Sequence, residues 1–222
     1  MRDWTATDRR IVMWAAMFVS VIVVVYILVG LIGMTARPPG LAALSQIDPY
    51  LAILEILLSL AALDFVILMT GIYAYASGDR KTFALIALAF AIAFAVLTCG
   101  VHFASLTVGR QLHSTTFPFA HRQLSFGEWP TVALSLDLLA WDFFLGLSLA
   151  FASGVFQGGG LKGRVRVSMI AAACLCLAGT LGPASGKMQI QYVGIAGYIL
   201  ALPVACTLLA MLFRQGITSE SS

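Results

Sequence analysis

Charged side chains are scarce in this chain of 222 residues. Asp, Glu, Lys and Arg make up 10% of it, whereas hydrophobic residues make up 60%. The mean hydropathy of +0.96 lies far above the balance of a water-soluble domain. The formal net charge is only +3, and no basic stretch interleaved with aromatic residues lies outside the apolar runs. These shortages exclude an ordinary soluble domain, and we expect no nucleic-acid partner.

Motifs for cofactor chemistry are also missing. The chain has no Walker A loop, no dinucleotide-binding fingerprint and no HExxH sequence. Only one histidine, His102, falls inside an apolar run, which disfavours haem held between two histidines. All four cysteines fall inside such runs, where a free thiol packs as a small apolar group: Cys99, Cys174, Cys176 and Cys206. We therefore expect no cofactor, and no motif specifies a resident metal.

Long apolar runs recur six times. A helix rises 1.5 Å per residue, so about 20 residues cross the roughly 30 Å of hydrocarbon, where helices satisfy their own backbone groups. The expected spans are approximately residues 10–34, 50–76, 81–108, 131–156, 165–184 and 190–213. The first run is too long for a signal peptide and reads as a retained anchor. The chain is predicted to be an all-α, polytopic transmembrane bundle forming a single integral membrane domain, 1–222.

The basic residues predict an orientation. Lys and Arg gather in loops on the cytoplasmic side of a membrane. Nine of the 13 fall on one side of the expected spans: Arg2, Arg9, Arg10, Arg80, Lys81, Lys162, Arg164, Arg166 and Arg214. The other side carries four: Arg37, Arg110, Arg122 and Lys187. Both termini are therefore expected in the cytoplasm, with the protein in a plasma membrane such as the inner membrane of a bacterium.

Two spans carry an aspartate at mid-membrane depth, and the residues around the two aspartates are similar in sequence. Asp64 ends Ser-Leu-Ala-Ala-Leu-Asp before a phenylalanine, and Asp142 ends Asp-Leu-Leu-Ala-Trp-Asp before another. Each is followed downstream by Ala-Ser-Gly and a basic loop, as expected for a duplicated hairpin in which the two acids would face each other. Ionised carboxylates are costly in hydrocarbon, so these acids must be paired, hydrated, protonated or in use.

A second group of polar residues shares one layer nearer the outer ends of the spans. Helical rise places Glu55, His102 and Asp137 at the same depth on three spans. They could clasp the helices together, form a proton or cation path, or carry out metal binding or acid–base catalysis. Helical phase puts Asp64 about 180° from Glu55, and Asp142 about 140° from Asp137, so one pocket does not readily hold all four acids. Trp141, one turn from Asp137, either walls a pocket or fills the bundle.

The loop over residues 109–130 is the longest connection. Its mixture of aromatic rings and histidines suits a segment lying in the membrane interface over the mouth of the bundle, where it could act as a lid. His113, His121 and Glu128 could bind a metal or sense external pH, although their spacing matches no metal signature. An ordinary solvated loop is the simpler interpretation.

Three classes of function fit these residues. The first, which we favour, is an acidic intramembrane site for binding or transport of a small solute or cation, with or without proton coupling; Asp64, Asp142, Glu55, Asp137, His102 and Trp141 are its candidate residues. The second is an enzyme acting on a lipid-soluble substrate through Glu55, His102 and Asp137. The third is an accessory or scaffold subunit, packed on partners through Gly30, Gly33, Gly194 and Gly197. Besides the lipid bilayer, the expected partners are a small solute, cation or lipid ligand, and a second copy of the chain.

Overall fold

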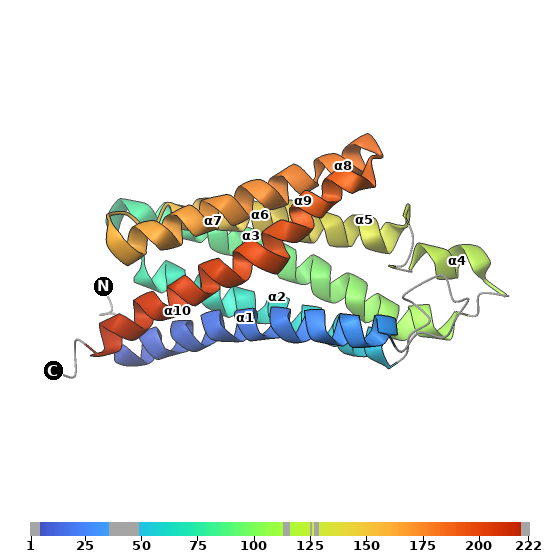
Figure 1. The fold of residues 1–222 in the computed structure, drawn as a ribbon, viewed down its shortest axis with the longest axis horizontal. Coiled ribbons are helices and arrows are strands. Elements are labelled where there is room, and N and C mark those ends of the chain that lie inside the picture. Colours follow the sequence, from blue (N-terminus) through green and yellow to red (C-terminus); the bar gives the residue numbers. More distant parts are fainter. Residues whose placement is uncertain (1–4, 36–48, 113–115, 125, 127–128, 219–222) are drawn as a thin grey trace.

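The structure is a computed structural model that describes residues 5–35, 49–112, 116–124, 126 and 129–218. Within these ranges the regular elements are all helical, and six assemblies of helices are long and apolar enough to cross a membrane. They lie roughly side by side along the long axis of the molecule (Figure 1). The predicted all-α, six-span architecture is confirmed.

The spans are built from the following elements. Span one is α1 (Ala6–Thr35), span two is α2 (Tyr50–Tyr75), and span three joins η2 (Gly78–Arg80), α3 (Lys81–Ala104) and η3 (Ser105–Gly109). Span four joins α5 (Val132–Leu138), η4 (Leu139–Phe144) and α6 (Leu145–Ser153), and span five joins α7 (Gly160–Gly179) and α8 (Leu181–Ser185). Span six joins η5 (Met188–Ile190), α9 (Gln191–Ala196), η6 (Gly197–Ala201) and α10 (Leu202–Thr218), and the short α4 (Pro118–Gln123) connects spans three and four.

The ends of two spans lie further out than hydropathy alone predicted. Helix α1 begins four residues earlier because Thr5 and Asp8 cap it reciprocally: the Thr5 amide donates to Asp8 Oδ2 at 2.9 Å, and the Asp8 amide donates to Thr5 Oγ1 at 3.2 Å. Helix α7 begins five residues earlier, at Gly160, so its first turns carry the basic residues that precede the apolar run. A helix can start in the headgroup region, where hydropathy gives no signal.

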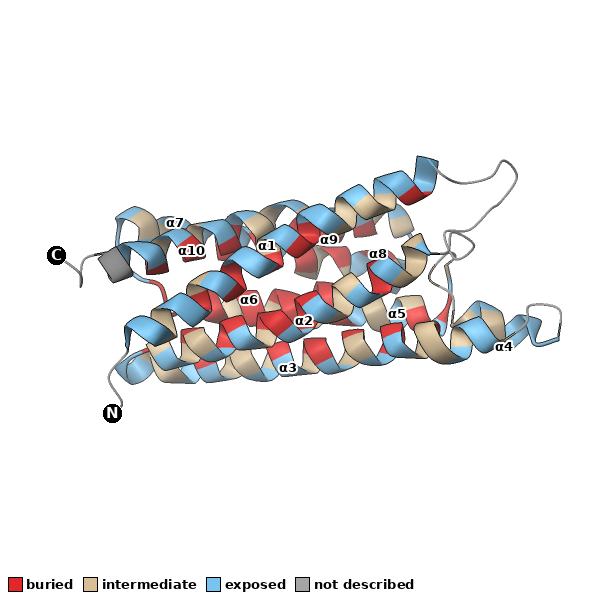
Figure 2. Ribbon diagram, turned by 90° about the horizontal axis from the view of Figure 1, so that it is seen from below, coloured by how far each residue is buried: buried red, intermediate tan, exposed pale blue. Residues whose placement is uncertain are grey.

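The six spans close into a ring. Helix α1 packs against α2 and α10, α2 packs against α3, and α3 packs against span four; α6 packs against α7, which packs against α10 and so closes the ring. Buried and exposed residues alternate along each span (Figure 2), and the exposed ones include many large apolar residues. Small inward residues such as Ala62, Ala87 and Ala91, each 0% exposed, allow the helices to approach closely.

The interior of the bundle is packed differently in its two halves along the long axis. In the half nearer the two termini, large side chains such as Phe65, Leu68, Ile72, Leu149 and Phe156 are almost fully buried in one continuous core. The half nearer α4 contains the polar residues of the predicted layer and a cavity, described below. The packed half lies between that cavity and the end of the bundle opposite α4.

Three of the spans contain a π-helical segment. Ser105–Gly109, Leu139–Phe144 and Gly197–Ala201 have this winding, in spans three, four and six. A π turn hydrogen-bonds residues five apart instead of four, and therefore changes which side chains share a face. All three segments contribute side chains to the cavities of the α4 half.

Both termini lie at the end of the bundle opposite α4 (Figure 1). Because basic residues favour the cytoplasm, we expect a fluorescent protein fused after the C-terminus to fluoresce and alkaline phosphatase fused there to be inactive in bacterial cells. The matched fusions truncated after Leu112, beyond span three, should show the opposite pair of results. Active phosphatase at the C-terminus would reverse the predicted orientation.

Candidate functional site

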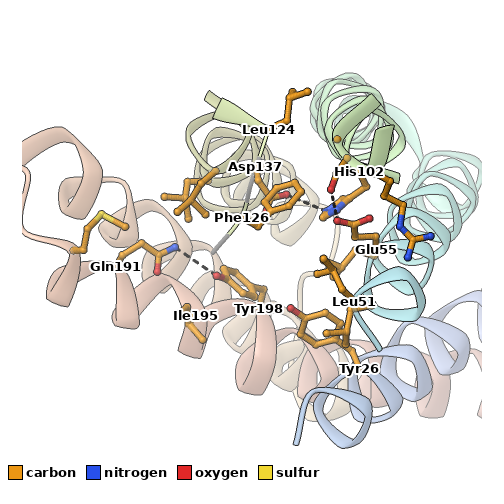
Figure 3. Close-up of a pocket in the computed structure, with 18 of the residues that line it drawn as sticks. Tyr26, Leu51, Glu55, His102, Leu124, Phe126, Asp137, Gln191, Ile195 and Tyr198 are labelled. Atoms are coloured by element: carbon orange, nitrogen blue, oxygen red, sulfur yellow. Dashed lines mark hydrogen bonds and ion pairs between the residues drawn. The ribbon is translucent and has the colours of Figure 1, made fainter. Parts of the chain in front are cut away.

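A cavity of about 980 Å³ opens between the spans at the α4 end of the bundle (Figure 3). Its wall is formed by spans one, two, three, four and six and by the α4 region. Much of the lining is apolar, but ten side chains bring polar atoms to it: Tyr26, Glu55, His102, Ser105, Arg110, His121, Asp137, Gln191, Tyr192 and Tyr198. This volume and mixed lining are typical of a site for a small molecule.

Glu55 reaches the cavity on a stripe of α2. Leu51, Leu54, Glu55 and Leu58 are spaced as one face of an α-helix, and all four line the cavity. Glu55 is 3% exposed, and its Oε1 accepts a hydrogen bond of 2.5 Å from the Ser105 hydroxyl. Because Ser105 is the first residue of the π segment in span three, this bond fixes the carboxylate of span two against span three.

His102 and Asp137 meet across spans three and four. His102 Nε2 lies 3.4 Å from Asp137 Oδ1, which is close enough for an ion pair when the imidazole is protonated. The geometry makes no hydrogen bond there, and neither ring nitrogen has a hydrogen-bond partner within the described part of the chain. The His102 ring stacks on Phe126, with centroids 4.9 Å apart. A pair of polar side chains whose hydrogen-bonding atoms are not satisfied by each other can bind a third group.

The three side chains predicted to share one layer, Glu55, His102 and Asp137, do line the same cavity. They do not form a metal site: among the described residues, no three His, Cys, Asp or Glu side chains are placed to hold an ion. In the loop, His121 also lines the cavity, whereas the other two candidates, His113 and Glu128, lie outside the described residues. Within the described part of the chain, the metal alternative therefore has no set of three donors.

A smaller pocket of about 140 Å³ lies deeper and adjoins the cavity. Asp137, Tyr26 and Tyr198 border both hollows. Trp141 forms part of the deep wall and also packs edge-on against Phe94, with centroids 4.8 Å apart. The sequence left open whether Trp141 walls a pocket or fills the bundle, and in the structure it does both.

An aromatic layer separates these hollows from the solid half of the bundle. Tyr198 packs on Trp141 with centroids 5.2 Å apart, and Trp141 packs on Phe94, which in turn packs edge-on against Phe65 at 5.7 Å. These four rings come from spans six, four, three and two. We call them the aromatic floor. The floor joins four of the six spans, and two of its rings, Tyr198 and Trp141, line the deep pocket.

Asp142 lies outside the cavity wall. It is 0% exposed, and its Oδ2 accepts a hydrogen bond of 2.9 Å from Gln191 Nε2. Its Oδ1 lies against the backbone where Gly179 of span five meets Gly194 of span six. Because Gln191 lines the cavity, Asp142 fixes a wall residue from behind. The predicted phase difference between Asp137 and Asp142 assumed an α-helix, but the π segment Leu139–Phe144 changes that phase.

Asp64 lies away from both hollows. It is 9% exposed and lines a groove of about 530 Å³ between α1 and α2, together with Arg10 and Trp14. Spans two and four are separated in the ring by span three. The arrangement expected from a duplicated hairpin, with Asp64 and Asp142 facing each other, is therefore not found. The structure divides the candidate acids: Glu55 and Asp137 share the cavity, and Asp64 and Asp142 do not.

Sequence reasoning missed six polar residues of the site: Tyr26, Ser105, Arg110, Gln191, Tyr192 and Tyr198. Gln191 and Tyr198 are seven residues apart, two helical turns, with Ile195 between them on the same lining stripe. This spacing was visible in the sequence as a polar stripe on span six. Tyr26 is a single polar group in an apolar run, and nothing in the sequence indicated where it points.

Comparison of the chain with protein-family models, curated proteins and solved structures finds no match. Any functional conclusion therefore depends on the chemistry of the cavity itself.

The contact between Asp142 and the two glycines predicts a sharp packing effect. A methyl group on Gly194 would lie 2.3 Å from Asp142 Oδ1 and 3.1 Å from the Gly179 Cα. We expect Gly194→Ala to lower the free energy of unfolding by about 1–3 kcal/mol through overpacking, measured as a loss of thermal stability in detergent. Gly30→Ala is the matched control, because a methyl group there meets no atom within 4 Å. Equal stabilities of the two variants would contradict this packing.

Proposed function

We propose that this multi-pass membrane protein binds a small organic cation in the cavity at the α4 end, with Asp137 as the counter-ion. The observation that carries the proposal is the carboxylate of Asp137, which borders a cavity of about 980 Å³. Its Oδ1 accepts no hydrogen bond within the described residues, and its ionic contact there is with His102 Nε2 at 3.4 Å. A carboxylate that is costly to keep within the membrane is well explained by a ligand that neutralises it.

The surroundings of Asp137 favour a cation over an anion. Both Glu55 and Asp137 carry acid groups into the cavity, and the rings of Tyr26 and Tyr198 border it beside Asp137. Aromatic faces attract organic cations. Among the described residues, the basic side chain of fixed charge in the lining is Arg110, just beyond the π segment of span three and toward the end of the bundle. An anionic ligand near Asp137 would meet acidic groups on two spans.

The hydrogen bonding gives no support to a serine–histidine mechanism. A hydroxyl nucleophile activated by a histidine needs the two side chains within hydrogen-bond reach of each other. The Ser105 hydroxyl donates to Glu55, and His102 lies beside Asp137, so the hydroxyl and the imidazole are not paired. The scaffold alternative is also weakened, because Gly194 and Gly197 pack within the bundle on span five instead of facing a partner.

Transport would require more than this arrangement provides. The cavity ends at the aromatic floor, and the core beyond it is packed through to the terminal end of the bundle. Binding from the α4 side is the part of the transport hypothesis that the geometry supports. Carrying a ligand across the membrane would need the floor to separate.

Asp137→Asn tests the proposal. The amide keeps the shape of the side chain but removes the charge, so we expect at least a tenfold loss of affinity for choline and benzylammonium, about 1.4 kcal/mol or more. Affinity would be measured by isothermal titration calorimetry on protein in mild detergent, alongside native mass spectrometry to identify any molecule that copurifies. Benzoate, an anion of similar size to benzylammonium, should bind neither protein.

Asp79→Asn is the matched control, since Asp79 is exposed in η2 at the opposite end of the bundle. It makes the same chemical change and should leave cation affinity unchanged. If wild-type protein binds none of these cations, or if Asp137→Asn and Asp79→Asn bind them equally, the proposed site is wrong. Thermal unfolding of each variant separates lost binding from lost structure.

A further inference from the structure

We infer that the ligand is an amine carrying a compact apolar group, with the amine at Asp137 and the apolar group in the deep pocket. This inference rests on the proposed function, because it assigns the second half of the same ligand. It follows from the way in which Asp137 lies between two hollows of different chemistry.

The deep pocket is apolar beyond its neck. Ile22 and Val23 of span one, Ala61 of span two and Ile199 of span six form its sides, and Trp141 contributes to its wall. An apolar cavity of about 150 Å³ in a protein stays dry and accommodates a benzene ring. The pocket here has a volume of about 140 Å³. It therefore fits one six-membered ring or a branched chain of similar size, and it excludes larger groups.

The neck is where a positive charge would be placed. Five residues line both hollows: Asp137, Tyr26, Tyr198, Leu58 and Ile195. A carboxylate and two tyrosines therefore lie where the two hollows adjoin, beside two aliphatic side chains. An ammonium group there would meet the carboxylate and lie beside ring faces. Since the deep pocket adjoins the neck directly, a linker of about two carbon atoms suffices to place a ring beyond Asp137.

The aromatic floor limits the length of the ligand. Trp141 is held edge-on against Phe94, which is 1% exposed and packed in turn against Phe65. A longer apolar chain would have to displace this closely packed layer. The deep pocket should therefore discriminate by size at its far end, whereas the wide cavity on the other side of Asp137 tolerates varied substituents on the amine.

The experiment compares 2-phenylethylamine with choline, a cation that lacks an apolar group, by calorimetry on the purified protein. We expect 2-phenylethylamine to bind at least tenfold more tightly than choline, and 2-(2-naphthyl)ethylamine to lose that advantage. Ala61→Leu, which fills the deep pocket, should weaken 2-phenylethylamine at least tenfold and change choline less than twofold. Ala74→Leu makes the same change at an exposed position of α2 and should alter neither affinity.

A second variant keeps the inference testable if Ala61→Leu does not fold. Ile199→Ala enlarges the deep pocket and should shift the preference from the phenyl to the naphthyl amine. If choline and 2-phenylethylamine bind equally and Asp137→Asn abolishes both, the deep-pocket inference is overturned while the proposed cation site stands. If neither amine binds to the wild-type protein, the proposed function itself fails.

Discussion

The cost of placing a carboxylate in hydrocarbon is the constraint on which the arrangement of this protein depends. Among the described residues, four acids lie at least five residues inside the ends of the spans, and each is sheltered differently. Glu55 accepts a hydrogen bond from Ser105, Asp142 is bonded to Gln191 and fully buried, and Asp137 lies beside His102 in a cavity. Asp64 lies between α1 and α2. The closed ring of six helices provides an interior in which Glu55, Asp137 and Asp142 are kept away from lipid chains. Asp64 instead lines a groove whose other residues include exposed apolar side chains.

The π segments explain how the same ring holds both a solid core and a cavity. Each of the three segments contributes a side chain to the hollows: Ser105 in span three, Trp141 in span four and Tyr198 in span six. In the half nearer the termini, α3, α6 and α10 keep regular α-helical winding, and large apolar side chains interdigitate there. A local change of winding therefore coincides with the change from packed core to binding space.

Asp137 is the residue on which the proposed binding chemistry depends. It touches the layer of His102 and Glu55 on one side and the deep apolar pocket on the other. Asp142, five residues later, holds Gln191 in the cavity wall without reaching the cavity itself. Span four thus carries one acid that borders the cavity, Asp137, and one that bonds within the protein, Asp142. Only Asp137 is expected to interact directly with a ligand in the site.

The amino-acid sequence by itself determined the class, the six spans and the shared depth of Glu55, His102 and Asp137. Hydropathy and helical rise depend on local composition and count, which a sequence contains directly. It did not determine which acids share a cavity, because that depends on how the helices are rotated and ordered around the ring. The phase between Asp137 and Asp142 was calculated for a regular α-helix, whereas a π segment, which leaves no clear mark in composition, lies between them. The conclusion drawn from it, that one pocket does not readily hold all four acids, agrees with the lining of the cavity. Only the tertiary structure decided that Asp64 faces α1 and that Gly179 and Gly194 lie against Asp142. It also decided that the four rings of the aromatic floor pack together. The reason is the same in each case, because these contacts join residues from different helices.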